Sequence, residues 1–97
     1  SRTDPLTGLA NRSHLLDDLA ARVAAGDAFG LLFLDLTQFK RFNDSYGHLA
    51  GDEVLRVVAQ RLAASVRKSD LAARWAGDEF VLVLDALVDP AALAQRA

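Results

Sequence analysis

The chain has 97 residues, which is enough for one domain with a modest core and too few for a second domain. Its 52% hydrophobic and 25% charged residues argue against intrinsic disorder, and its formal net charge of −2 argues against duplex nucleic acid as a partner. Cysteine is absent, which excludes disulfides, thiolate metal sites and cysteine nucleophiles. Because no apolar run is long enough to span a membrane and no signal peptide is recognisable, we expect a cytoplasmic segment without membrane contact, whether or not its parent protein is membrane-tethered.

The first predicted element is a helix that begins near Asn11 to Ser13 and ends at Gly26. Asparagine and serine favour helix starts, and glycine favours helix ends. Apolar residues recur at helical spacing between these limits and are expected to share one buried face. They are Leu15, Leu16, Leu19, Ala20 and Val23.

Residues 30–36, with the sequence GLLFLDL, form an apolar run of strand length that begins at a glycine. This pattern predicts a strand that is buried on both faces. Asp35 is the exception within it. A lone carboxylate at the end of a buried strand is unfavourable unless it is paired, hydrogen-bonded or bound to a metal ion.

A polar segment with two glycines, residues 37–51, follows this strand, and a short helix or turn is expected around Phe39 to Asp44. Asp52 is predicted to cap a long helix that continues to Arg67 or Lys68. Five apolar residues recur at helical spacing along it and are expected to face the core. They are Leu55, Val58, Ala59, Leu62 and Val66.

From Leu71 onward the periodicity changes to that of two strands, joined by a tight turn at Gly77-Asp78. A further helix is predicted to begin at Asp89-Pro90, because proline is favoured in the first turn of a helix. This order of elements predicts an α/β fold, an α+β sandwich whose central sheet is partly antiparallel.

Asp78 lies in the predicted turn and Glu79 directly follows it, and both would lie beside Asp35 if the two strands are neighbours in the sheet. Three carboxylates at close range repel one another unless a divalent cation neutralises them. Oxygen ligands favour Mg²⁺ or Mn²⁺ over zinc, and Mg²⁺ commonly shares its shell between carboxylates and substrate phosphates, which implies a nucleoside triphosphate. The alternative is an ordinary solvated acidic turn.

Residues 43–52, NDSYGHLAGD, contain a second candidate site. The amide of Asn43 and the carboxylate of Asp52 offer donors and acceptors that match a purine edge, and a carboxylate suits the N1–H and 2-amino group of guanine. Alternatively, Asn43 is a turn residue and Asp52 a helix cap. Lys40 either contacts a phosphate or is solvated.

Three segments together resemble the successive motifs of the GGDEF domain, the diguanylate cyclase family. They are residues 4–12 (DPLTGLANR), 34–55 (LDLTQFKRFNDSYGHLAGDEVL) and 74–80 (RWAGDEF). The resemblance implies a fold related to nucleotidyl cyclase and polymerase palm domains. It also implies that two GTP molecules, one on each subunit of a head-to-head homodimer, are joined into cyclic di-GMP with release of two pyrophosphates.

The resemblance also implies roles for the acidic residues. Asp35 and the backbone carbonyl of Leu36 would bind the metal ion, Mg²⁺ or Mn²⁺. Asp78 would bind metal and take the proton from the 3′-hydroxyl, and Glu79 would assist metal binding. Lys40 would stabilise charge on the phosphates. These roles agree with the general requirements of metal-assisted phosphoryl transfer.

For ligand recognition, the resemblance assigns Asn43 and Asp52 to the guanine base and places His48 close to the bound nucleotide. Arg67 and Asp70 form an RxxD sequence in the register of the family's inhibitory product site, where cyclic di-GMP would bind. The alternative for this pair is a helix C-terminus followed by a turn.

The sequence departs from the family pattern in three places. Ala76 replaces the first glycine of the last motif, which is tolerable if its φ is negative. Thr37 replaces a second aspartate that is not usually a metal ligand. Family domains also continue through further strands and a helix with a lysine and an arginine that grip the triphosphate, so we expect residues 1–97 to be an incomplete domain that alone does not turn over GTP efficiently.

The sequence leaves two other functions open. The chain could be a catalytically silent GGDEF-like sensor that binds cyclic di-GMP or GTP, or a dimerisation unit of a larger signalling protein. The presence of Asp35, Asp78, Glu79, Asn43 and Asp52 together favours the enzyme.

Overall fold

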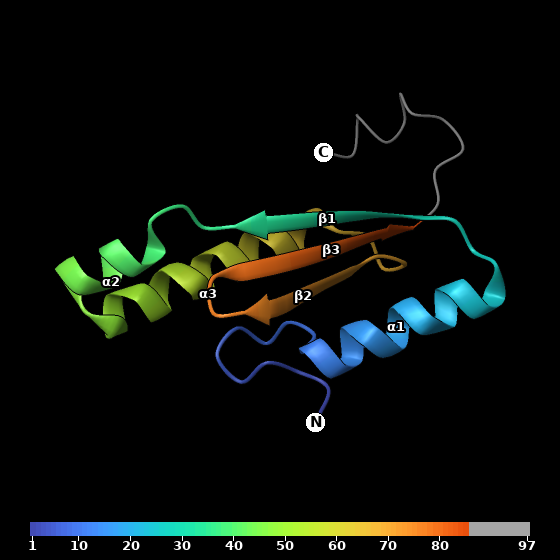
Figure 1. Ribbon diagram of the computed structural model, residues 1–97, viewed down its shortest axis with the longest axis horizontal. Helices are drawn as coiled ribbons and strands as arrows, with labels where there is room; N and C mark the ends of the chain where they lie inside the picture. The colour runs from blue at the N-terminus through green and yellow to red at the C-terminus, as the bar shows by residue number, and fades with distance from the viewer. Residues whose placement is uncertain (86–97) are drawn as a thin grey trace.

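The computed structural model describes residues 1–85, so the helix predicted from Asp89 onward lies outside the described residues. The elements follow the predicted order of helix, strand, helices and hairpin (Figure 1). They are α1 (Arg12–Ala25), β1 (Phe29–Asp35), α2 (Phe39–Tyr46), α3 (His48–Ser65), β2 (Leu71–Ala76) and β3 (Glu79–Asp85). Within residues 1–85, no helix combines the length and hydropathy needed to cross a bilayer.

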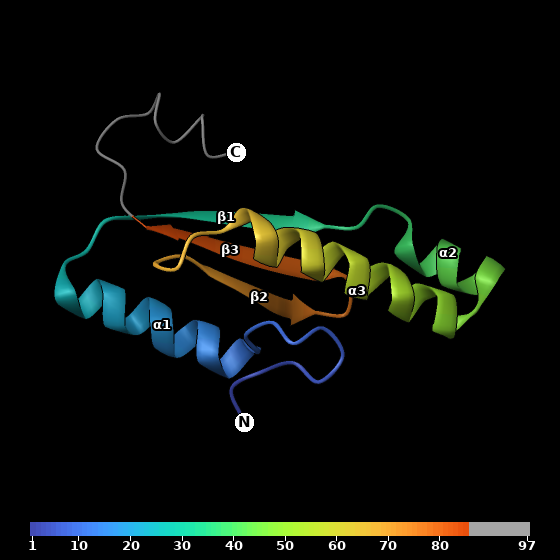
Figure 2. The ribbon, with the colours of Figure 1, turned by 180° about the vertical axis from the view of Figure 1, so that it is seen from behind.

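The three described strands form one sheet in the order β1-β3-β2, and both pairings are antiparallel. Successive residues of β3 face opposite sides of the sheet, as the pleat requires. On one side Phe80 and Leu82 pack with Leu55 and Ala59 of α3. On the other side Val81 and Val83 pack with Leu15 of α1, and Figure 2 shows α3 lying along the sheet. The predicted α+β sandwich is therefore confirmed.

The predicted boundaries of α1 agree with the structure. Asn11 caps the helix, and its side-chain oxygen accepts a hydrogen bond from the backbone N–H of His14 at 2.9 Å. Gly26 ends the helix with a φ of 72°, which is a left-handed conformation that glycine adopts without strain. The predicted buried face is wrong in part, because Leu16, Ala20 and Val23 are exposed.

Strand β1 is not buried on both faces, contrary to the prediction. It is the edge strand of the described sheet, and Leu31, Leu32 and Phe33 are 53%, 46% and 56% exposed. The helices pack over β2 and β3, so the middle of β1 extends beyond their cover. Asp35 is also exposed, so the expected cost of a buried carboxylate does not arise.

The prediction that Asp52 caps a helix is also wrong. Helix α3 begins at His48, four residues earlier, and ends at Ser65 instead of Arg67 or Lys68. Gly47 separates α2 from α3, and its φ of 88° with ψ of 161° is a conformation open essentially to glycine alone. Asp52 therefore lies in the second turn of α3, where its carboxylate is free for another role.

Candidate functional site

The residues of the predicted site meet at one end of the molecule. Figure 1 shows the end of β1, helix α2, the start of α3 and the β2–β3 turn at the same end of the sheet. A cavity of about 520 Å³ lies among α2, α3 and this turn. Its lining residues are Phe39, Lys40, Asn43, Asp44, His48, Asp52, Leu55, Arg74, Gly77 and Asp78.

Helical spacing explains how two of these elements present their side chains to one cavity. Residues three or four apart lie on the same helix face. In α2 this spacing relates Lys40, Asn43 and Asp44, and in α3 it relates His48 to Asp52. Each group therefore projects from one helix face. The cavity thus collects five residues that the sequence predicted, namely Lys40, Asn43, His48, Asp52 and Asp78.

Asn43 is the member of this set whose environment is least satisfied. Its Oδ1 is buried and has no hydrogen-bond partner among the described residues. A buried polar atom without a partner costs roughly 1–3 kcal/mol, so such atoms are rare and each calls for an explanation, such as a functional role or a bound water or ion. The alternative, that Asn43 is a turn residue, does not hold, because Asn43 lies within α2.

Arg74 and Asp44 are cavity residues to which the sequence assigned no role. The guanidinium of Arg74 donates hydrogen bonds to the carbonyl oxygen of Gly77, at 2.9 and 3.2 Å, and to the carboxylate of Asp4, at 3.2 and 3.3 Å. Both charged side chains are only 18% exposed. Arg74 therefore ties the β2–β3 turn to the N-terminal segment.

Asp4 is held in its charged form by this arrangement. Burial is the largest single influence and by itself would raise the pKa of Asp4. It is outweighed by hydrogen bonds from the backbone N–H and the hydroxyl of Thr7 and by the hydrogen bond and charge of Arg74, so the pKa of Asp4 lies below its ordinary value.

Arg12 makes a second connection to the same hairpin. Its guanidinium lies 4.0 Å from the centre of the Trp75 ring, and it donates two hydrogen bonds to the Trp75 carbonyl oxygen, at 2.9 and 3.1 Å. A cation over an indole face is attracted by the negative face of the ring. The first turn of α1 therefore fixes the strand that leads into the turn. Ala76, which follows, does not adopt a positive φ, so its methyl group is tolerated there.

Two acidic residues of the predicted metal site, Asp35 and Glu79, lie on the neighbouring strands β1 and β3, and the third, Asp78, lies in the β2–β3 turn. Asp35 is the register partner of Glu79, and the N–H of Leu36 donates to the carbonyl oxygen of Asp78 at 3.1 Å. Among residues 1–85, no group of three acidic, histidine or cysteine side chains is close enough to hold a metal ion. Because Mg²⁺ commonly takes one or two carboxylates and completes its shell with phosphates and water, this donor set fits an ion that arrives with a nucleotide.

The RxxD pair has a different structural setting. The side chain of Asp70 is buried, with 8% exposed, and its two oxygens accept hydrogen bonds from the backbone N–H groups of Arg67 and Asp85 at 2.8 and 2.7 Å. Arg67 itself is exposed. Asp70 thus joins the segment after α3 to the end of β3.

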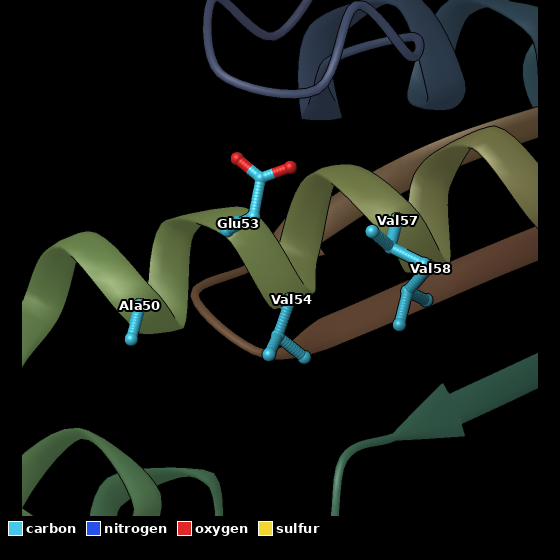
Figure 3. A pocket seen from close by; sticks show the side chains of 5 residues that line it. All are labelled: Ala50, Glu53, Val54, Val57 and Val58. Atoms are coloured by element: carbon cyan, nitrogen blue, oxygen red, sulfur yellow. The ribbon is translucent and has the colours of Figure 1, made fainter. Parts of the chain in front are cut away.

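A second hollow, of about 420 Å³, lies along α3 and has a different character. Its lining residues are Ala50, Glu53, Val54, Val57 and Val58. Figure 3 shows that the carboxylate of Glu53 points away from the side on which Ala50 and Val54 lie. The hollow therefore offers mainly apolar surface. It lacks the converging charged and polar side chains that line the cavity at the β2–β3 turn.

Comparisons with known proteins show the family to which the chain belongs. The family model described as "Diguanylate cyclase, GGDEF domain" matches residues 1–97. The chain is 48% identical over 89 residues to the diguanylate cyclase DgcP of Pseudomonas aeruginosa, covering 87% of this chain and 13% of that protein. It is 46% identical over 100 residues to the response regulator PleD of Caulobacter vibrioides, covering 97% of this chain and 22% of that protein. The chain thus spans less than a quarter of the length of either relative.

The crystal structure of the GGDEF domain of DgcB from Caulobacter crescentus, in complex with c-di-GMP, shares the fold. Its TM-score is 0.85 at 34% identity, and the match covers 99% of this chain and 58% of that one. Because the family model matches the chain from end to end and the fold is that of a solved GGDEF domain, this chain belongs to the GGDEF domain family.

Proposed function

We propose that this chain forms the nucleotide-binding part of a diguanylate cyclase, which condenses two GTP molecules into cyclic di-GMP and two pyrophosphates. The observation that carries the proposal is the cavity at the β2–β3 turn. Its lining includes an ammonium group, an amide, an imidazole and two carboxylates from the predicted residues Lys40, Asn43, His48, Asp52 and Asp78, together with Asp44 and Arg74. This combination suits a ligand with a polar base and a charged phosphate chain.

The base of GTP is assigned to Asn43 and Asp52, which line the cavity from α2 and α3. A carboxylate accepts hydrogen bonds from the N1–H and 2-amino group of guanine, and an amide complements the remaining polar edge. Since Asp52 is not a helix cap, its carboxylate is available for this contact. Lys40 is exposed at the cavity and is assigned to the phosphates, with His48 beside the nucleotide.

Mg²⁺ or Mn²⁺ is assigned to the carboxylates of Asp35, Asp78 and Glu79 and to the backbone carbonyl of Leu36. Bound there with GTP, the ion would neutralise charge on the phosphates. The hydrogen bond from Leu36 N–H to the Asp78 carbonyl and the Asp35–Glu79 register hold these groups beside one another, where β1 ends and β3 begins.

In the reaction, the 3′-hydroxyl oxygen of one GTP forms a bond to the α-phosphorus of the other. The bond from that phosphorus to the pyrophosphate breaks, and pyrophosphate leaves with the electron pair. Asp78 is assigned as the base that accepts the hydroxyl proton, because a half-buried carboxylate lining the cavity can lie within reach of that proton. The same step repeated with the roles exchanged closes the ring.

Two further features of the proposal concern assembly and regulation. Because each GTP supplies the nucleophile for the other, we assign catalysis to a homodimer with one GTP on each subunit. Arg67, exposed after α3, is assigned to feedback inhibition by cyclic di-GMP. Asp70 holds the backbone of Arg67 in place, which supports a positioning role in that site.

The test is to incubate the full-length protein with GTP and Mg²⁺ and to look for cyclic di-GMP by mass spectrometry. Asp78→Asn, which keeps the size of the side chain and removes its basicity, is expected to lower the rate at least a thousandfold, on the order expected for loss of a catalytic base together with metal affinity. Asp17→Asn, on the exposed face of α1, is the control for loss of one negative charge.

Product from a protein with Asp78→Asn at the wild-type rate would contradict the role of Asp78. A wild-type protein that binds GTP and makes no product would favour the second candidate, a sensor that binds cyclic di-GMP or GTP without turnover. The known complex of the DgcB GGDEF domain with c-di-GMP supports this candidate as far as binding is concerned.

A further inference from the structure

Gly51 lies in α3 directly before Asp52 and is buried where α3 packs against α2. A Cβ atom at this position would overlap with Oδ1 of Asn43, lie 2.8 Å from Asn43 Cγ and lie 3.2 Å from Cζ of Phe39. Protein interiors are packed too tightly to absorb such an overlap without a shift of the neighbour. No residue other than glycine therefore fits at position 51 while the Asn43 side chain keeps its place.

Backbone geometry does not explain this glycine. Gly51 lies inside a helix, where glycine is less favourable than alanine, and its φ is not positive. The remaining reason for glycine is the space that it leaves for the Asn43 amide. This amide is also the one whose Oδ1 is buried without a partner among the described residues.

We infer that Gly51 is a specificity-determining position for the nucleotide base, acting as a positioning residue that seats the amide of Asn43. The inference rests on the proposed function, because it takes the cavity to be the guanine site. Gly51 touches neither base nor phosphate in this role. It fixes where Asn43 stands relative to Asp52, the next residue along α3.

The chemistry of the two purines makes this position decisive. Guanine presents the O6 acceptor beside the N1–H and 2-amino donors, whereas adenine presents a 6-amino donor beside an unprotonated N1. An amide and a carboxylate held at a fixed separation match the donors and acceptor of guanine. With adenine, the same two side chains leave hydrogen-bonding groups unpaired. A displaced Asn43 therefore weakens discrimination between the bases, while the contacts of the phosphates stay as they were.

The experiment measures equilibrium binding of α,β-methylene analogues of GTP and ATP to the full-length protein by calorimetry. In these analogues a methylene group replaces the oxygen atom between the α- and β-phosphorus atoms. The bond that breaks in the proposed reaction therefore cannot be cleaved, and binding is measured without turnover. Four proteins are compared: wild type, Gly51→Ala, Asn43→Ala, and the double variant. Ala50→Gly, one residue earlier in the same helix, is the control for changed helix propensity.

Gly51→Ala is expected to weaken binding of the GTP analogue about tenfold and to leave binding of the ATP analogue within about twofold, the size expected for loss of one hydrogen-bonding partner. Asn43→Ala is expected to do the same. In the Asn43→Ala background, Gly51→Ala should have no further effect on the ratio of the two affinities, since the side chain that it would strike is gone. A role limited to helix packing would change both affinities equally and would leave their ratio unchanged.

Retention of the wild-type ratio by a folded Gly51→Ala protein would overturn the inference while leaving the proposed function intact. Equal affinity of the wild type for the two analogues would overturn both together. If Gly51→Ala alone does not fold, recovery of folding and of ATP-analogue binding in the double variant would support the inference. Failure of the double variant to fold would overturn it, because the clash would then not be with Asn43.

Discussion

Replacing Asp70 with alanine tests whether this residue mainly holds the fold. Its two carboxylate oxygens accept hydrogen bonds from the backbone N–H groups of Arg67 and Asp85, and the side chain is 8% exposed. Asp70→Ala leaves both donors without this acceptor. An unpaired buried donor costs about 1–3 kcal/mol, so two of them, partly reached by water at the sheet end, should lower the free energy of unfolding by about 2 to 4 kcal/mol.

The assay is urea unfolding of the full-length protein, with amide hydrogen exchange by mass spectrometry to locate the effect. Exchange should become faster in peptides that contain Arg67 and Asp85, while peptides from α2 stay unchanged. Ser69→Ala is the matched control, since Ser69 contributes a backbone carbonyl to Arg22 and no described side-chain hydrogen bond. A loss below about 0.5 kcal/mol for Asp70→Ala, which is the usual size for a surface substitution, would refute this reasoning.

Two further predictions concern the charged residues at either end of the sheet. Because the pKa of Asp4 is lowered from 3.8, the charged carboxylate stabilises the fold above that pH, and this contribution is lost as the pH falls through the folded-state pKa. Asp4→Asn should therefore lower the free energy of unfolding by about 1–2 kcal/mol at pH 7, measured by urea titration. The difference from wild type should shrink below about pH 4. A difference that grows in acid would contradict the role of Arg74. Arg67→Ala should raise the concentration of cyclic di-GMP needed for half-inhibition about tenfold, the size expected for loss of one charge-assisted contact. Lys68→Ala is the control and should leave that concentration unchanged. Equal inhibition of both variants and the wild type in a steady-state assay would remove Arg67 from the product site.

The element order of the fold could be predicted because the residues that begin and end its elements act locally. Asn11 and Gly26 bound α1, and Gly77 marks the turn between two runs of strand-forming residues. The burial of β1 could not be predicted, since the run from residue 30 to 36 has the same pattern whether its strand is central or at an edge. The start of α3 was also missed, because the helix boundary depends on the backbone conformation of Gly47 and not on a capping side chain.

The candidate site was predicted by motif resemblance more than by periodicity. Spacing alone left Asp52 as a cap and Asn43 as a turn residue, and only the packing of α2 against α3 brings the two helices to one cavity. Arg74 was not assigned a role, since its partner Asp4 lies 70 residues earlier in the chain. Contacts over such a separation are set by the fold as a whole and leave no local pattern.

The position of Trp75 has an experimental consequence. It is the one tryptophan in the sequence, it precedes the β2–β3 turn by two residues, and a guanidinium lies against its ring. Indole fluorescence is sensitive to a nearby charge, so light emitted by this residue reports directly on the contact between α1 and the hairpin. Trp75 is therefore an intrinsic fluorescent label within a few residues of Asp78, and a change in the contact between α1 and the hairpin can be followed in real time without attaching a dye.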